Sequence, residues 1–297
     1  MAYSSKAVEM QANVALRKLR RFLDASEPRL VYFLVNLWKN QGDAITYKEL
    51  RESILAGELV TDYLEEWRED YSRFVTERLL PEWEKAMSVA EKDLIATHPD
   101  WKYNTAAFGS SEWMRDRAAE FVTSVSDTQI DGLRAVIRNA SVLHTMSVDE
   151  LARAIRPMVG LYAAQATANL KYYEKLIENG VNQNRARDLS IRYGARQHRY
   201  RAFMISRTEL AFGYGRGIYE GVKQAQRDGY VGEARKVWAT ALDERTCPTC
   251  GALEGKEIGI DEEFDFDTRL KTPGIKLMPP LHPNCRCTTL IITTPPK

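Results

Sequence analysis

Apolar positions recur every three or four residues along most of the chain as far as about residue 232, with polar residues between them. This spacing places apolar side chains on one face of an α-helix. It predicts a helix up to about residue 25 that ends before Pro28, and a second apolar helix over 29–39. We expect residues 1–125 to be helical almost throughout.

Three pairs of residues with the S/T-x-x-E/Q spacing are interpreted as capping boxes that start a helix. They are Thr46 with Glu49, Ser126 with Gln129, and Ser147 with Glu150. A helix is expected to begin at each pair, and Pro157 should kink or end the last of these helices. The apolar stripe that follows Thr46 continues to Val75, so the sequence favours one helix over this stretch.

That stripe is rich in aromatic side chains. Its aromatic members are Tyr63, Trp67, Tyr71 and Phe74, and further tryptophans follow at Trp83, Trp101 and Trp113. Two interpretations stay open at this point. The aromatic residues could pack a helical core, or they could form a groove or ridge for a partner protein.

The central part of the chain is also helical by pattern. A long helix is predicted from about Leu161 to Glu178, ended by Asn179 and Gly180. A further helix is predicted over 206–230, where glycines recur at positions 213, 215, 217 and 221. Because glycine disfavours a helix interior, these glycines are expected where another backbone packs closely.

Between these two helices lies a run of basic residues. Its arginines are Arg185, Arg187, Arg192, Arg196, Arg199 and Arg201, and Asp188 is the acidic residue among them. Such a run can be a solvated helix face. It can also contact phosphates of a nucleic acid or an acidic protein surface.

The pattern changes after Gly232. Residues 236–242 and 287–293 are β-branched or alternating and predict short strands, and Ile258 and Ile260 suit another. The acidic, turn-forming stretch 261–274 should be an exposed loop. The sequence therefore predicts a mainly α protein with a small β-containing C-terminal subdomain.

All four cysteines of the 297 residues lie in this subdomain, together with one of the four histidines. They are Cys247, Cys250, Cys285, Cys287 and His282. The spacing of Cys247 and Cys250 lets two thiolates face one ion, and structural zinc takes four cysteine or histidine ligands in a tetrahedron. We expect a zinc-knuckle-like site held by Cys247, Cys250 and Cys285, with Cys287 or His282 as the fourth ligand.

The local geometry leaves that choice open. If 285–287 is extended, Cys285 and Cys287 share one face while Arg286 points away. If the chain turns there, His282 completes the site instead. Without metal, paired disulfides could form in an oxidising environment.

Composition and charge restrict the classes of function. The net charge of +1 gives no global attraction to nucleic acid or to a membrane. No secretory signal begins the sequence, and the longest apolar run, 30–38, is too short to span a bilayer. We expect a soluble protein made in the cytosol, a reducing compartment in which clustered cysteines favour a metal site.

Catalysis is not expected. No His/Cys-x-Glu motif of a nucleobase deaminase precedes Cys247. His282 and Asn284 allow a metal-dependent nuclease or other nucleic-acid-processing protein as the alternative, although the paired histidines usual in such a nuclease are missing.

A long, ordered string of residues resembles the phage Mu F-like minor head protein family. The string comprises Arg207-Thr208-Glu209, Trp238, the run from Asp243 to Cys250, residues 253–256, and the run from Pro279 through Arg286 to Cys287. The likeness extends over about 126–293. It divides the chain into an N-terminal region, 1–125, and a Mu F-like domain, 126–297, with a helical part, 126–232, and a Cys/His-rich part, 233–297.

The resemblance implies a virion component rather than an enzyme. Members of this family are few-copy proteins inside the phage head, near the portal. The implied partners are the portal protein, with packaged DNA and capsid or scaffold protein as further possibilities, and no membrane. The implied role is in head assembly, DNA packaging or DNA ejection, with 1–125 as a portal-docking arm.

Overall fold

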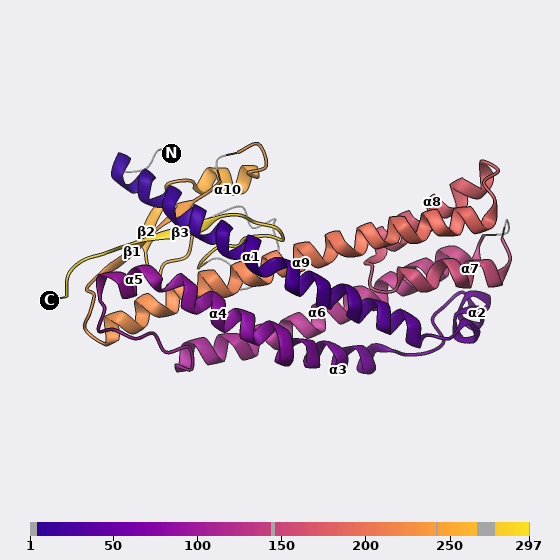
Figure 1. The fold of residues 1–297 in the computed structure, drawn as a ribbon, viewed down its shortest axis with the longest axis horizontal. Coiled ribbons are helices and arrows are strands. Elements are labelled where there is room, and N and C mark those ends of the chain that lie inside the picture. Colours follow the sequence, from indigo (N-terminus) through magenta and orange to yellow (C-terminus); the bar gives the residue numbers. More distant parts are fainter. Residues whose placement is uncertain (1–4, 144–145, 242, 266–276, 297) are drawn as a thin grey trace. The chain divides into compact units, whose positions relative to one another are not determined.

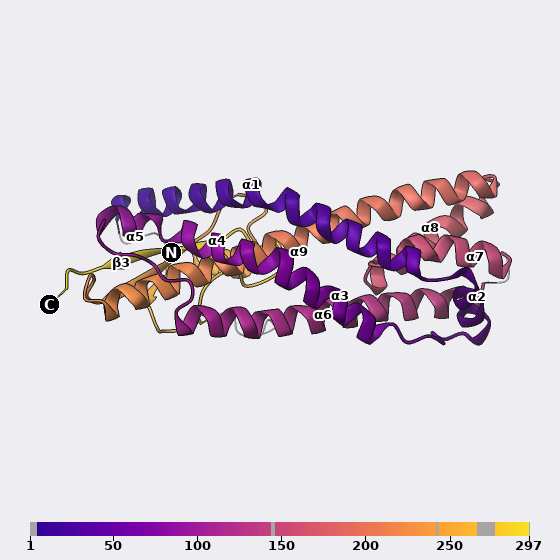
Figure 2. The same ribbon diagram turned by 60° about the horizontal axis from the view of Figure 1, so that its bottom comes forward.

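The computed structural model describes residues 5–143, 146–241, 243–265 and 277–296. Helices form most of these ranges, and three short strands near the C-terminus pair into one sheet (Figures 1 and 2). The predicted fold class, mainly α with a small β-containing subdomain that holds the Cys/His cluster, is therefore confirmed. Within the described ranges, no helix has both the length and the apolar character needed to cross a bilayer.

The α-helices are α1 (Lys6–Ala44), α2 (Tyr47–Ala56), α3 (Leu64–Phe74), α4 (Leu80–Ala90), α5 (Lys92–Thr97), α6 (Phe108–Ser141), α7 (Val148–Ile155), α8 (Ala163–Glu178), α9 (Gln183–Arg227) and α10 (Pro248–Leu253). A π-helical turn, η1 (Val75–Leu79), joins α3 to α4, and a 3₁₀ turn, η2 (Arg156–Met158), follows α7 at Pro157 as expected. The strands are β1 (Ala234–Ala239), β2 (Glu257–Gly259) and β3 (Thr288–Thr293).

The chain forms two compact units. Unit 1 comprises Met1–Pro28, Arg78–Arg115 and Met204–Lys297, and unit 2 comprises Arg29–Glu77 and Asp116–Phe203. Helices α1, α6 and α9 therefore each contribute residues to both units. The predicted boundary between residues 125 and 126 lies inside α6, and the division into 1–125 and 126–297 stays a prediction.

The predicted break before Pro28 is wrong. Helix α1 continues through this proline, although an interior proline removes a hydrogen bond and costs about 3 kcal/mol. The apolar positions on either side offset that cost, since Leu23 and Leu30 are both almost fully buried. Burying one leucine side chain contributes about 1.5–3 kcal/mol.

Two of the three capping boxes are confirmed. The hydroxyl of Thr46 accepts from the Glu49 N–H, the Glu49 carboxylate accepts from the Thr46 N–H, and the box at Ser147 has the same reciprocal bonds. Ser126, by contrast, lies inside α6, where its hydroxyl donates to a main-chain carbonyl one turn earlier. The apolar stripe of α6 continues through it, so nothing ends the preceding helix.

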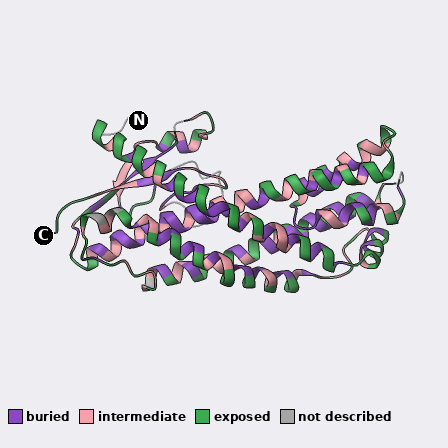
Figure 3. Cartoon of the chain, viewed as in Figure 1, coloured by how far each residue is buried: buried purple, intermediate pink, exposed green. Residues whose placement is uncertain are grey.

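The aromatic stripe packs the core of unit 2. Gly57 ends α2 in the left-handed conformation at φ 74°, so the stripe is divided between α2 and α3. Trp67 and Tyr71 are almost completely buried, and the Trp38 indole N–H donates to the Tyr71 hydroxyl at 2.7 Å. Figure 3 shows the buried stripes along the helices. The interpretation of these aromatic side chains as a partner-binding surface is therefore wrong.

The basic run and the glycine-rich segment form one helix, α9, rather than two. No proline or left-handed glycine interrupts it, and buried apolar residues such as Ala202 and Leu210 continue its stripe. The close packing expected at its glycines is confirmed. A Cβ on Gly217 would lie 2.4 Å from the Cα of Met87, so only glycine lets α4 approach this closely.

The sheet is antiparallel with the order β2-β1-β3. Lys236 of β1 lies opposite Ile258 of β2 and Ile291 of β3. The three predicted strands are thus confirmed with slightly different ends. Residue 242 of the first predicted strand, and the part of the acidic loop over 266–274, lie outside the described residues.

Candidate metal centre

The first half of the Cys/His cluster is a short helical turn. Cys247 occupies the N-cap of α10 and Pro248 its first position. The Cys247 Sγ accepts a hydrogen bond from the Cys250 N–H at 3.3 Å. This is the knuckle that the two-residue spacing predicts, with both sulfurs on the same side of the turn.

The second half is a tight turn that precedes β3. The Cys285 N–H donates to the His282 carbonyl at 3.1 Å. Asn284, between them, has φ 60°, a left-handed conformation that asparagine adopts more readily than most residues. The turn brings the side chains of His282 and Cys285 to the same side as the knuckle.

The two halves meet through their ligand atoms. The His282 Nε2 lies 3.2 Å from the Cys247 Sγ and 3.4 Å from the Cys250 Sγ, and the Cys250 and Cys285 sulfurs are 3.8 Å apart. Two groups of three donors result, Cys247–Cys250–His282 and Cys250–Cys285–Cys287, which share Cys250. All four cysteines are free thiols.

Each of these three separations suits two ligands of one tetrahedral zinc ion, although no four donors among the described residues all lie within 4.8 Å of one another. Zinc–sulfur bonds of about 2.3 Å and zinc–nitrogen bonds of about 2.0 Å place neighbouring sulfurs about 3.8 Å apart and sulfur and nitrogen about 3.5 Å apart. The donor set consists of sulfur and imidazole nitrogen, with no carboxylate in either group. The His282 Nδ1 lies 2.9 Å from the Pro283 carbonyl, and donation to this oxygen leaves Nε2 as the ligand atom.

The donors polarise one another. Hydrogen bonds from Cys250 and Cys287 lower the pKa of Cys285 well below its usual value. The same contacts raise the pKa of Cys250, because a second negative charge beside Cys285 is unfavourable. The hydrogen bond with Cys285 raises the pKa of His282 to about 9. The cluster therefore concentrates negative charge on sulfur, where a cation would be stabilised.

The cluster is part of a small hydrophobic core. Three of its cysteines are buried against Trp238, Leu253, Phe264 and Leu281. The Trp238 and Phe264 rings meet edge to face, with centroids 4.9 Å apart. Because the sulfurs belong to the core, ligation would hold together residues that have few other apolar neighbours.

An ion pair joins the two halves on the outer side. Arg286 donates to both carboxylate oxygens of Asp243 at 2.5 Å. This hydrogen bonding holds the pKa of Asp243 well below its usual value and raises that of Arg286.

The motif residues on α9 attach the cluster to the helices of unit 1. The Thr208 hydroxyl accepts from the Asn284 N–H at 2.9 Å. Arg207 forms a bidentate pair with Glu27 of α1, and the Glu209 carbonyl accepts from the Trp83 indole at 3.0 Å. Each residue of this triplet therefore contacts a different segment of the unit.

The arginines predicted as a contact surface lie on the first half of α9, in unit 2. Arg185, Arg192, Arg196 and Arg199 are exposed, and Arg187 is half-buried. The prediction that Arg201 belongs to this contact surface is wrong. It is buried, donates to the Gly160 carbonyl and the Thr128 hydroxyl, and lies over the Trp38 ring, so it stabilises the core of unit 2.

Comparison with known families supports the resemblance stated above. The family model described as phage Mu protein F like protein matches residues 147–290, a range that includes α9 and every residue of the Cys/His cluster. Residues 147–290 belong to the phage Mu protein F-like family. No curated protein and no solved structure matches the chain.

Some contacts of the Mu F-like region were not predicted from its sequence. Asp243 and Arg286 are both positions of the family motif, but the motif does not indicate that they pair. Glu27 was also missed, although an acidic residue between the apolar positions Leu23 and Leu30 is a recognisable sign of a buried partner.

Proposed function

We propose that the protein is a minor component of a phage head that assists head assembly, DNA packaging or DNA ejection in association with the portal. The match of residues 147–290 to the phage Mu protein F-like family carries this proposal. The location that follows is the virion, inside the head and near the portal, after synthesis in the host cytoplasm. The partners that follow are portal protein and other virion components.

Particle composition tests this proposal. Procapsids and mature virions of the phage that encodes the chain should both contain the protein by mass spectrometry, and tagged portal protein should retain it when both are co-expressed. Absence from both kinds of particle would rule out a structural role in the head. Presence in particles without retention by portal would refute the portal association alone.

We further propose that Cys247, Cys250, Cys285 and His282 hold one structural zinc ion. The contact of His282 Nε2 with two thiols, with Nδ1 turned to a carbonyl, supports histidine rather than Cys287 as the fourth ligand. The ion would supply only cross-linking, because four protein donors leave no open position for a substrate.

Metal analysis of matched variants tests the ligand set. The wild-type protein should contain one zinc per chain, and a chelator should lower its unfolding temperature. His282→Ala should lose the zinc, whereas Cys287→Ala should keep it. The reverse result would establish an all-cysteine site, and a metal-free wild-type protein, expressed with zinc in the medium, would refute the centre altogether.

We propose that the four exposed arginines, here called the arginine ridge (Arg185, Arg192, Arg196 and Arg199), contact DNA phosphates. At 100° per residue these positions fall within about 60° of one another and extend over about 21 Å of α9. Within the described residues none of the four forms an ion pair. Segment 163–203, which contains the ridge, has eight basic and three acidic residues in a chain of net charge +1.

Salt dependence of binding tests the ridge. Each phosphate contact contributes about 0.9 to the slope of log affinity against log salt. Arg192→Gln with Arg196→Gln should therefore reduce the slope for duplex DNA by about 1.8. The control variant, Lys48→Gln with Arg134→Gln, removes two exposed charges that already have acidic neighbours and should leave the slope unchanged. Equal slopes in both variants, with portal retention lost in the first, would point to an acidic protein surface instead.

We propose that the protein acts without catalysis. The described donor groups contain only cysteine and histidine, and His282 Nε2 faces sulfur rather than open space. The alternative, a metal-dependent nuclease, predicts cleavage of DNA by the pure protein with zinc or magnesium. Cleavage that disappears in His282→Ala would overturn the proposal.

A further inference from the structure

The outer edge of the sheet has unused main-chain hydrogen-bonding groups. Among the described residues, β3 is an edge strand that pairs with β1 alone. Just beyond β3, the Thr294 N–H donates to the Glu233 carbonyl. Because the direction of the main-chain N–H and C=O groups alternates along a strand, these groups point toward β1 at the even-numbered residues of β3. The N–H and C=O groups of Thr289, Ile291 and Thr293 therefore point away from the sheet.

The same alternation holds on the other side of β1. The Trp238 N–H donates to β2 at the Lys256 carbonyl, and the Ala234 carbonyl accepts from Ile260. These β1 residues lie opposite Thr289 and Thr293, which confirms that the two threonines direct no main-chain group at β1. Among the described residues, none of the outward main-chain groups of β3 has a hydrogen-bond partner.

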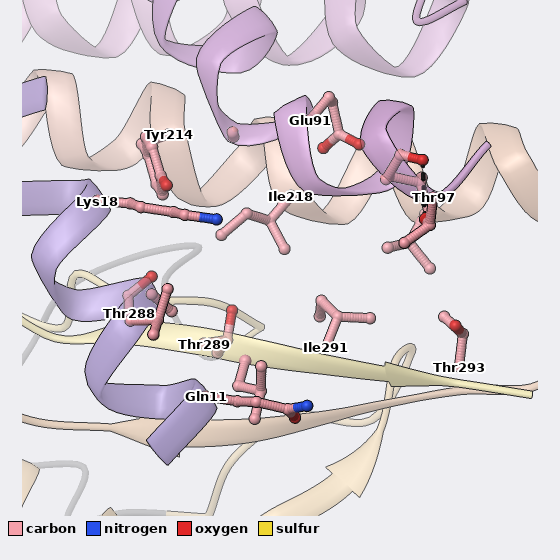
Figure 4. A pocket seen from close by; sticks show the side chains of 16 residues that line it. Gln11, Lys18, Glu91, Thr97, Tyr214, Ile218, Thr288, Thr289, Ile291 and Thr293 are labelled. Carbon is pink, nitrogen blue, oxygen red and sulfur yellow. Dashed lines mark hydrogen bonds between the residues drawn. The ribbon is translucent and has the colours of Figure 1, made fainter. Parts of the chain in front are cut away.

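This edge forms one wall of a groove in unit 1 (Figure 4). Four consecutive residues of β3, Thr288 to Ile291, line it together with Thr293. Consecutive residues of a strand point to opposite faces, so the edge of β3, rather than either face, borders the space. The other walls come from α1, α9 and the segment of α4 and α5, and the cavity has a volume of about 410 Å³.

We propose that this groove binds an extended segment of a partner protein, which adds to β3 as a fourth strand. The inference concerns a surface of the chain beyond the zinc centre and the arginine ridge, and it does not depend on the head-protein assignment. Three outward residues at alternate positions span about 14 Å, which corresponds to a partner segment of about five residues.

The groove walls define the side chains that such a segment needs. Apolar side chains that line the groove include Ile218 and Val222 of α9 and Val14 and Ala15 of α1. Small or branched apolar residues of an added strand suit these walls. The ammonium group of Lys18 points into the groove (Figure 4), and Glu91 of the α4–α5 segment also lines it. An acidic side chain at the Lys18 end therefore gives charge complementarity.

The dimensions favour a single extended segment over a second copy of the chain. Pairing β3 with β3 of another molecule would bring the partner's own β1 and helices to within a few strand spacings of about 4.8 Å. Helix α1 and the α4–α5 segment also line the groove, so they would compete with the partner's own β1 and helices for the space beside the edge. A segment without its own neighbouring strands meets no such obstacle.

Capped hexapeptides that alternate valine and threonine provide the probe. One peptide ends in glutamate, the second ends in lysine, and the third is the glutamate peptide with alternate main-chain nitrogens methylated to remove its donors. Fluorescence anisotropy measures affinity, and NMR-detected hydrogen exchange measures protection of single amides. The glutamate peptide should bind most tightly and slow the exchange of the amides of Thr289, Ile291 and Thr293. Methylation should abolish binding.

Neighbouring basic residues of α1 provide a matched pair of variants. Lys18 lines the groove, whereas Arg17 is exposed outside it. Lys18→Glu should lower the affinity for the glutamate peptide by about tenfold, and Arg17→Glu should lower it by less than twofold. Because both variants change the net charge equally, a difference between them locates the peptide in the groove.

Several results would overturn the proposal. One is no slowing of the three amides at millimolar concentrations of any peptide. Another is slow exchange of these amides in the free monomer, because the groove would then be closed by the chain itself. A third is slow exchange of these amides only at protein concentrations at which sedimentation shows dimers. That result would identify a second copy of the chain as the occupant of the groove.

Discussion

The pair formed by Arg207 and Glu27 provides the sharpest test of how the helices of unit 1 are held together. The perturbation is Arg207→Met, which keeps a long apolar stem and removes the charge. In the structure Nε and Nη2 of Arg207 lie 2.6 and 3.1 Å from the two carboxylate oxygens of Glu27. The side chains are 14% and 5% exposed, so the variant leaves a buried carboxylate without its main cation.

Burial sets the size of the effect. Breaking a buried pair by removing one partner costs about 3–5 kcal/mol, because the remaining charge stays desolvated. In a unit of this size the corresponding fall in unfolding temperature is about 10 °C. The double variant Arg207→Met with Glu27→Met should recover most of this loss, since it removes the buried charge as well.

Urea and thermal unfolding measure the free energy of unfolding. Arg235→Met is the matched control, because Arg235 and Glu257 form a pair of the same 2.6 Å length with the arginine 56% exposed. An exposed pair contributes about 0–1 kcal/mol. A loss in Arg207→Met no larger than in this control would refute the reasoning, as would a double variant no more stable than the single one.

The pH dependence adds an independent check. Burial raises the pKa of Glu27, and Arg207 opposes that rise. Removing Arg207 should raise the pKa further, so the folded variant retains a proton that the unfolded chain releases above about pH 4.3. Stability of Arg207→Met should therefore fall as the pH rises from about 4 and level off above the folded-state pKa. A penalty that does not change with pH would contradict the proposed cause.

Other predictions concern local features. Ser147→Ala should cost about 1 kcal/mol in urea unfolding because its capping box is lost, whereas Ser126→Ala, inside α6, should cost less than half as much. Gly217→Ala should cost about 1–3 kcal/mol, whereas Gly251→Ala should be tolerated, since its Cβ would meet no atom nearer than 4.0 Å. Asp243→Asn should be less stable than wild type above about pH 4, and this difference should shrink as the pH falls toward the folded-state pKa of Asp243. The reason is that the Asp243 carboxylate stabilises the fold through Arg286 only while it is ionised.

Patterns within a few residues were predicted well from the sequence. The reciprocal capping at Thr46 and Ser147, the knuckle of Cys247 and Cys250, and the glycine packing on α9 each depend on short spacings and local chemistry. The three strands were also found, because β-branched residues cluster there and glycine and proline bound them.

Features that depend on tertiary contacts were not predicted. Local preference favours a break at Pro28, but burial on both sides keeps α1 continuous. Ser126 has the residues of a capping box without an interruption before it. Arg201 is indistinguishable in sequence from the arginines of the ridge, and only its contacts with Gly160 and Trp38 show that it is buried.

The edge position of β3 could not be predicted from the sequence either. The strand itself is evident from its composition, but its edge position depends on the order β2-β1-β3. That order arises from pairings between residues 20 or more positions apart in the sequence, for which the residues carry no local pattern.

The composition of unit 1 from three separate segments has a consequence for biosynthesis. Its first segment ends at Pro28 and its last begins at Met204, so Glu27 leaves the ribosome 180 residues before Arg207. Unit 2 has all its residues once Phe203 is made and can fold first. We expect the apolar face of the first turns of α1 to stay uncovered until the segment from Met204 onward is also made, which makes this stretch a candidate substrate for a chaperone during translation.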